Sequence, residues 1–164
     1  QVRGILDHAN GISQQALETA DADVEAYEGV RAAHRLPVPI SARDTAKAEA
    51  IQKALENAAT VPWLLAESCD VCYTKALELR PICNQNLVSD IDVAICLLQA
   101  AVAGLWVNVD INLKSIDDKA FTENLRVKIR TLVGRIRAVD PVPVKELLGL
   151  VWEEKLARRD SEGR

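Results

Sequence analysis

Apolar residues recur every three to four positions along most of the chain, and strict alternation over the length of a strand is hard to find. That period is typical of amphipathic helices, in which residues three and four apart share one face. The sequence therefore predicts an all-α protein. Short connections and the lack of an internal repeat favour an antiparallel bundle of five to six helices.

The expected helices are separated by prolines and by polar capping residues. The first runs from about Val2 to His34, and the second from a Ser41/Asp44 capping box to about Ala58. Thr60, Val61 and Pro62 mark a helix start or a kink, and the third helix reaches about Leu79. The loop Arg80–Asn86 follows, with Asn86 or Ser89 as the cap of the fourth helix. Ser115 with Asp118 opens a fifth helix with the apolar seam Phe121, Leu125, Ile129, Leu132 and Ile136, and a last helix is expected over Val144–Leu156.

The fourth helix is the most apolar part of the chain. From Val93 to Val107 it is apolar on almost every side, with Gln99 as the exception. A run of this length is shorter than the ~20 residues of a membrane span, so no membrane contact is expected. We expect instead a buried central helix that its neighbours surround.

Composition and charge narrow the class of protein. The 164 residues fit one domain, and 49% apolar with 27% charged residues is typical of a chain with a packed core. A net charge of −4 and a pI near 5.3 argue against general nucleic-acid binding. Five bases on the fifth helix would suit an anionic ligand tail, although a solvated polar face explains them better: Arg126, Lys128, Arg130, Arg135 and Arg137.

Cysteines raise the question of a metal or redox module. Cys69 and Cys72 have the spacing of a ligand pair, but no second close pair and no nearby His completes a tetrahedral set. We therefore interpret the four cysteines as reduced core thiols, which indicates a cytoplasmic protein and no metal site. A cysteine-based module would need Cys69 and Cys72 exposed and near Cys83.

One acid is placed unexpectedly on the first helix. At ~100° per residue, Asp23 points the same way as Ile12, Tyr27 and Val30, on the apolar stripe. A buried carboxylate either pairs with a cation or acquires a raised pKa, which suits a general acid or base. The two explanations, a structural ion pair and a site residue, stay open.

A polar and small-residue strip lies on the fourth helix. Its members project within about 40° of one direction: Asp90, Leu97, Ala101, Gly104, Asn108 and Asn112. Such a strip admits a flat ligand or another backbone, while amides and a carboxylate bond its polar ends. Close helix packing with locally bonded Asn side chains is the structural alternative. The preceding loop adds Asn86 and Ser89 at a helix N-terminus, where anions bind well, though capping alone would explain both.

Five segments in this order resemble the cyclodeaminase domain of formiminotransferase-cyclodeaminase and the stand-alone methenyltetrahydrofolate cyclohydrolases. They are Asp23–Tyr27, Arg35–Pro37, Ala59–Pro62, Asn86–Asp90 and Asn108–Lys114. The similarity covers roughly residues 21 to 121. It implies an all-helical homodimer that acts on a tetrahydrofolate derivative, without a tightly bound cofactor.

The resemblance also implies roles for individual residues. Asp23 matches the acid regarded as catalytic in the cyclodeaminase domain. Carboxylate acid–base catalysis would serve either reaction: hydrolysis of the methenyl bridge or loss of ammonia from the formimino group. The remaining site residues would orient the pterin or the attacking water, or would line the pocket: Tyr27, Asn86, Ser89, Asp90, Asn108 and Asn112. These residues are expected to converge around one cleft.

The chain also departs from the family pattern. Family members generally begin with a Pro-Gly-Gly-Gly segment and one more helix, which this sequence lacks before Gln1. Cys83 stands where the family tends to have Gly, and Asp92 at a position usually small and uncharged. Either the chain is trimmed or it is a divergent member with an altered pocket, and we expect residues 1–164 to form a single domain without that segment. The alternative to an enzyme is a non-catalytic helical dimerisation scaffold of the same fold that has lost its folate pocket.

Overall fold

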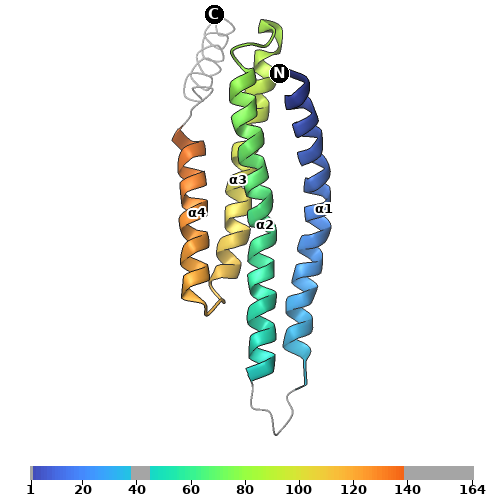
Figure 1. Ribbon diagram of the computed structural model, residues 1–164, viewed down its shortest axis with the longest axis vertical. Helices are drawn as coiled ribbons and strands as arrows, with labels where there is room; N and C mark the ends of the chain where they lie inside the picture. The colour runs from blue at the N-terminus through green and yellow to red at the C-terminus, as the bar shows by residue number, and fades with distance from the viewer. Residues whose placement is uncertain (1, 38–44, 139–164) are drawn as a thin grey trace, which may run out of the picture.

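The computed structural model describes residues 2–37 and 45–138 of the chain, and every regular element in them is a helix. Four α-helices and a short 3₁₀ turn follow one another: α1 (Val2–Arg35), α2 (Thr45–Leu79), η1 (Gln85–Leu87), α3 (Val88–Leu113) and α4 (Lys119–Ala138). Consecutive helices run in opposite directions (Figure 1). The prediction of an all-α fold is confirmed. The Ser41/Asp44 cap and the expected last helix lie outside the described residues.

Two of the expected helices are one. α2 continues through Pro62, so the break expected near Thr60 is absent. Proline has no N–H to donate to the carbonyl of residue i−4, which here is the buried carbonyl of Ala58. The side-chain amide of Asn112 on α3 donates to that carbonyl over 3.1 Å. A bond between helices thus replaces the bond that Pro62 cannot make, which is why the helix tolerates the proline.

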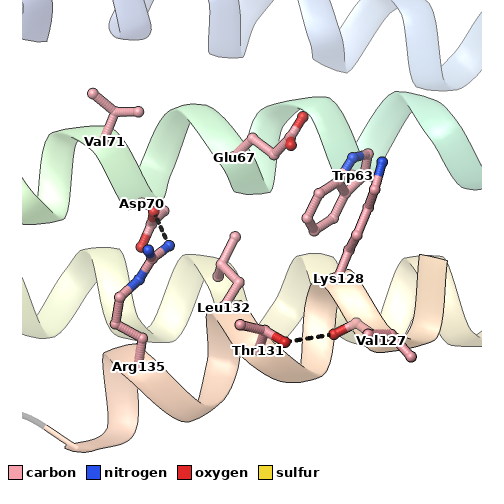
Figure 2. A pocket seen from close by; sticks show the side chains of 9 residues that line it. All are labelled: Trp63, Glu67, Asp70, Val71, Val127, Lys128, Thr131, Leu132 and Arg135. Atoms are coloured by element: carbon pink, nitrogen blue, oxygen red, sulfur yellow. Dashed lines mark hydrogen bonds and ion pairs between the residues drawn. The ribbon is translucent and has the colours of Figure 1, made fainter. Parts of the chain in front are cut away.

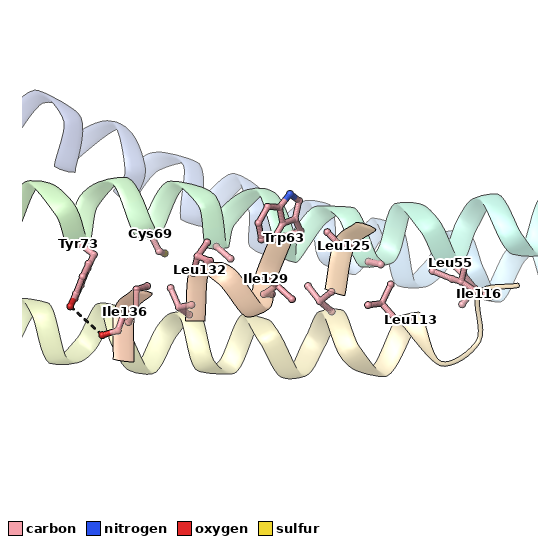
Figure 3. Packing of buried hydrophobic residues seen from close by; sticks show 14 of the residues in the cluster. Leu55, Trp63, Cys69, Tyr73, Leu113, Ile116, Leu125, Ile129, Leu132 and Ile136 are labelled. Carbon is pink, nitrogen blue, oxygen red and sulfur yellow. Dashed lines mark hydrogen bonds between the residues drawn. The ribbon is translucent and has the colours of Figure 1, made fainter. Parts of the chain in front are cut away.

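α2 occupies the centre of the fold. It contacts α1 on one side and α3 and α4 on the other, whereas no Cα atoms of α1 and α3 lie within 8 Å of each other. In Figure 1 α2 accordingly lies between α1 and the α3–α4 pair. The core fills the space between α2, α3 and α4 (Figure 3), and its largest fully buried side chains include Tyr73, Ile95, Leu113, Ile116 and Ile129.

The expectation of α3 as a buried central helix is wrong. Only Ile95, Val102, Val109 and Leu113 of α3 are buried, because α3 has neighbours on one side only. The helical segment Gln85–Leu113 has 29 residues and is long and apolar enough to cross a membrane. The argument from length against a membrane span therefore does not hold.

α4 follows the sequence prediction closely. Leu125, Ile129, Leu132 and Ile136 of the expected seam are buried, and Phe121 is half-buried against the same core. The N-terminal cap of α4 differs from the expected pair of Ser115 and Asp118. The Oδ1 atom of Asp118 itself accepts the N–H of Phe121 over 2.9 Å.

The connection between α3 and α4 is held on α2 by one side chain. Gln52 accepts the backbone N–H of Asp117 over 2.7 Å and donates to the carbonyl of Ser115 over 3.2 Å. Both hydrogen bonds fix where α4 begins relative to α2, and so align the α4 seam with the core.

Candidate functional site

The predicted site residues on α1 are exposed. Asp23 and Tyr27 face solvent, with Tyr27 62% exposed, whereas Ala26 and Ala33 are buried. Asp23 is turned by about 60° from the direction of Ala26, at the edge of the contact with α2. The prediction that Asp23 is buried is wrong. The contact between α1 and α2 is narrow, because it is formed by small alanine side chains, and Asp23 lies outside it. The Arg31 guanidinium lies 5.9 Å from the centre of the Tyr27 ring.

The loop before α3 presents its polar side chains to water. Asn86, Ser89 and Asp90 are all exposed. Neither Asn86 nor Ser89 caps α3, since Leu87 is its N-cap residue and makes no side-chain capping bond. Asn84 is the capping residue here, because its Oδ1 atom accepts the N–H of Asn86 over 3.0 Å at the start of η1.

A two-pronged ion pair fixes the turn between α2 and α3. Arg80 donates to both carboxylate oxygens of Asp92, over 2.6 and 3.1 Å. The hydrogen bond to Asp92 raises the pKa of the Arg80 guanidinium. Asp92, a departure from the family pattern, therefore has a structural partner within this chain.

Asn108 and Asn112 lie at the other end of α3. Asn108 is exposed. Asn112 donates its amide N–H groups to the carbonyls of Ala58 and Asn108, over 3.1 and 2.9 Å. The amide nitrogen of Asn112 thus bonds both locally and to the neighbouring helix, as the structural alternative predicts.

These groups do not converge within one chain. Asp90 and Asn108 are about five helical turns apart, roughly 27 Å along the axis of α3. α1, which carries Asp23, has no close backbone contact with α3. The prediction of a single cleft formed by these residues is therefore wrong for the described part of one chain.

The structure does contain a groove that the sequence did not indicate, between α2 and α4 (Figure 2). Two adjoining hollows of about 440 and 590 Å³ share Trp63, Glu67 and Lys128. The first hollow also contains an ion pair between Arg135 and Asp70. Arg135 is 58% exposed, whereas the side chain of Asp70 is only 13% exposed and its Oδ1 atom has no hydrogen-bond partner.

The sequence analysis did not single out Asp70, although its position in the apolar pattern of α2 could have indicated it. Asp70 lies on α2 among the buried Ala66, Cys69 and Tyr73, just as Asp23 was expected to lie on the stripe of α1. Of the five bases noted on the fifth helix, Arg135 is the one that pairs with this acid. Oppositely charged side chains face each other in the groove and neutralise each other. They therefore suit a structural ion pair better than a binding site for a cation or an anion.

The cysteines do not form a site. Cys69 is buried and Cys72, Cys83 and Cys96 are half-buried, all as free thiols. Burial, together with the neighbouring Cys72, raises the pKa of the Cys69 thiol, and burial raises that of Cys72. Within residues 2–37 and 45–138, no group of three His, Cys, Asp or Glu side chains is arranged to hold a metal ion.

Comparison with known proteins gives a consistent picture. The formiminotransferase-cyclodeaminase family matches residues 1–131. Formimidoyltransferase-cyclodeaminase of Sus scrofa is 32% identical over 132 residues, which cover 80% of this chain and 24% of that protein. Methenyltetrahydrofolate cyclohydrolase of Methylorubrum extorquens is 29% identical over 139 residues, or 85% of this chain and 67% of the relative.

A solved structure supports the same relationship. Formiminotetrahydrofolate cyclodeaminase of Thermotoga maritima superposes with a TM-score of 0.69 at 28% identity, over 79% of this chain and 60% of that one. The chain thus spans about a quarter of the bifunctional relative and most, but not all, of the stand-alone ones.

Proposed function

Since this chain belongs to the formiminotransferase-cyclodeaminase family, we propose that it is an enzyme of folate one-carbon chemistry. The reaction is the hydrolysis of methenyltetrahydrofolate or the cyclising deamination of formiminotetrahydrofolate. The family match over residues 1–131 carries this proposal. The names of the stand-alone relatives support it, because one is a cyclohydrolase and the other a cyclodeaminase of tetrahydrofolate derivatives.

Both reactions occur at one carbon between N5 and N10 of the folate. In hydrolysis, water adds to the methenyl carbon and loses a proton. The bond to N5 then breaks as N5 gains a proton, and the new hydroxyl group loses its own proton to solvent and becomes the formyl carbonyl. In deamination, N10 attacks the formimino carbon and loses a proton, and ammonia departs after its nitrogen has gained one. Each path needs one group that accepts a proton and then returns it, which a single carboxylate does well.

Asp23 is the carboxylate to which we assign this proton transfer. It is exposed at the edge of the α1–α2 contact, so the bound substrate or a second chain has to exclude water from it. Exclusion of water destabilises the charged form of a carboxylate and so makes it a stronger base. Tyr27, one turn further along α1, would contact the substrate on the same side.

The remaining assigned residues orient the substrate. Asn86, Ser89 and Asp90 are exposed at the start of α3 and offer donors and acceptors for a pterin ring. Asn108 is exposed near the other end, and Asn112 offers its Oδ1 atom. Fixed polar groups of this kind accelerate a reaction by holding the reacting atoms in place.

The test is an assay with methenyltetrahydrofolate, whose near-ultraviolet absorbance disappears on hydrolysis, and a second assay for ammonia release from formiminotetrahydrofolate. Asp23→Asn keeps the shape of the side chain but removes the base, so we expect kcat to fall by about 100-fold or more. Asp21→Asn, also exposed on α1, is the matched control and should retain wild-type kcat. A chain that turns over neither substrate would favour the non-catalytic scaffold.

A further inference from the structure

Three of the residues assigned to the substrate lie at the turn between α2 and α3, where the chain is exposed. Asn86 lies in η1, and Ser89 and Asp90 lie in the first turn of α3. None of residues 84–90 is buried. A segment without buried side chains opens easily unless other contacts hold its ends. The position of the three residues therefore depends on how the turn is anchored.

Hydrogen bonds inside the turn fix its local shape. The Oδ1 atom of Asn84 accepts the N–H of Asn86 over 3.0 Å, and the N–H of Leu87 donates to the carbonyl of Asn84 over 2.8 Å. Leu87 precedes α3 without a side-chain capping bond. All these bonds join residues within three positions of one another, so they do not fix the turn relative to α2 and α3.

Arg80 connects the two sides of the turn. Its backbone N–H donates to the carbonyl of Ala76 over 3.0 Å, which extends the last turn of α2. Its guanidinium donates to both carboxylate oxygens of Asp92, which lies in α3, twelve residues further along the chain. The ion pair thus closes a loop that contains the whole turn. Such a link reduces the number of conformations open to the residues inside the loop.

The Arg80–Asp92 pair has the geometry of a strong ion pair. Two parallel hydrogen bonds between a guanidinium and a carboxylate fix the orientation of both groups as well as their distance. The side chain of Asp92 is only 15% exposed, so water competes little for its oxygens. By contrast, Lys75 and Glu78 form an exposed pair within one turn of α2, and pairs of that kind contribute little.

Cys83 adds a second restraint at the same residue. Its thiol donates to the carbonyl of Arg80 over 3.3 Å, and its backbone N–H donates to the carbonyl of Leu79 over 3.0 Å. Cys83 and Asp92, the two departures from the family pattern, therefore both bond to Arg80. Together they hold its backbone and its side chain.

We propose that Arg80 and Asp92 are positioning residues that hold Asn86, Ser89 and Asp90 where the folate substrate binds. This inference rests on the proposed function. Asp92 is turned by about 160° around α3 from Asp90, towards Arg80 at the end of α2, so the pair acts through the backbone and not by touching the substrate. A segment that is already ordered binds its ligand more tightly, because it loses less conformational freedom on binding.

Binding of tetrahydrofolate, measured by isothermal titration calorimetry, tests the positioning role. Arg80→Met removes both hydrogen bonds to Asp92, so we expect the dissociation constant to rise about tenfold. The KM for methenyltetrahydrofolate should rise with it, while kcat falls less. Arg80→Lys keeps the charge but loses the two-pronged geometry, and should recover only part of the affinity.

Lys75→Met, which breaks the exposed ion pair of α2, is the matched control and should bind tetrahydrofolate like wild type. A folded Arg80→Met protein with wild-type affinity and KM would overturn the proposal. If Arg80→Met does not fold, Asp92→Asn makes the same test, because the unpaired charge is then that of Arg80, which is 40% exposed and solvated.

Hydrogen exchange shows whether the pair orders the turn, whatever the substrate. The backbone N–H groups of Asn86 and Leu87 should exchange about tenfold faster in Asp92→Asn, whereas that of the buried Val102 in α3 should be unchanged. Equal acceleration at all three would indicate a general loss of stability and contradict the proposal. If the wild type neither binds tetrahydrofolate nor turns over either folate, the proposed function and the role in folate binding fail together, and the exchange rates still decide whether the pair orders the turn.

Discussion

At the scale of single residues, Asp70 shows how burial changes the value of an ion pair. Its carboxylate is nearly buried among apolar side chains of α2, and Arg135 of α4 donates to one of its two oxygens (Figure 2). A pair between exposed side chains contributes little, because water solvates both charges in the unfolded chain and in the folded one. Here the carboxylate has lost most of its water, so the loss of the cation is costly.

We therefore predict that Arg135→Met destabilises the fold by about 1–2 kcal/mol, less than for a fully buried pair because Arg135 is half exposed. Urea denaturation followed by circular dichroism measures the change. Arg130→Met, at an exposed position of the same helix, is the control and should stay within about 0.5 kcal/mol of wild type. Equal losses in the two variants would mean that the pair has no special role.

At the scale of secondary structure, α2 and α3 depend on one hydrogen bond. α2 is continuous through Pro62 because the amide of Asn112 supplies the donor that proline lacks. Ala58, whose carbonyl accepts that bond, is only 6% exposed, so without Asn112 the oxygen would have no partner in a dry environment. A residue assigned to the site thus also determines how α3 lies on α2.

A double-mutant cycle checks this dependence. Asn112→Ala should cost about 1–3 kcal/mol of folding free energy, because it leaves the Ala58 carbonyl unpaired. In a Pro62→Ala background the backbone N–H of residue 62 replaces the lost donor, and the same substitution should cost clearly less. Additive effects of the two substitutions, measured by urea denaturation, would contradict the compensation. Asn108→Ala is the stability control, since Asn108 is exposed and its side chain is not used between helices.

At the scale of the whole molecule, the core is one-sided. α2 separates α1 from α3 and α4, and the outer face of α3 is left exposed (Figure 1). The resemblance to this family implies a homodimer. A second copy packed on the exposed face of α3, which carries Val93, Leu97, Val107 and Ile111, would bury that face, so the free energy of folding would include the free energy of association.

Thermal stability should consequently depend on concentration. We predict that the melting temperature of the wild type rises measurably between about 1 and 100 μM protein, because mass action favours the dimer. Gly104→Leu places a bulky side chain on the exposed face of α3, where a Cβ atom meets nothing within 4 Å, and would block a second copy there, so its melting temperature should not change over this range. Differential scanning calorimetry at several concentrations makes the comparison, and a wild-type melting temperature independent of concentration would contradict the dimer.

The sequence by itself determined the helices, the family and the seam of α4. Helical periodicity is a local property, so the pattern from Phe121 to Ile136 identified the buried face correctly. The ordered motifs from Asp23 to Lys114 indicated the family that the comparisons then showed. The capping residues were less predictable, because the sequence does not distinguish between neighbouring residues with the same side chain, such as Asn84 and Asn86, as the cap.

Only the tertiary structure decided which faces are covered. Periodicity shows that a helix has an apolar side, but not whether a neighbour lies there, so Asp23 was expected to be buried and α3 to be central. The continuity of α2 through Pro62 depends on Asn112, which is distant in sequence. The pairing of Asp70 with Arg135 depends in the same way on how α4 lies on α2. Burial and pairing arise from contacts between segments, and these form only when the chain folds.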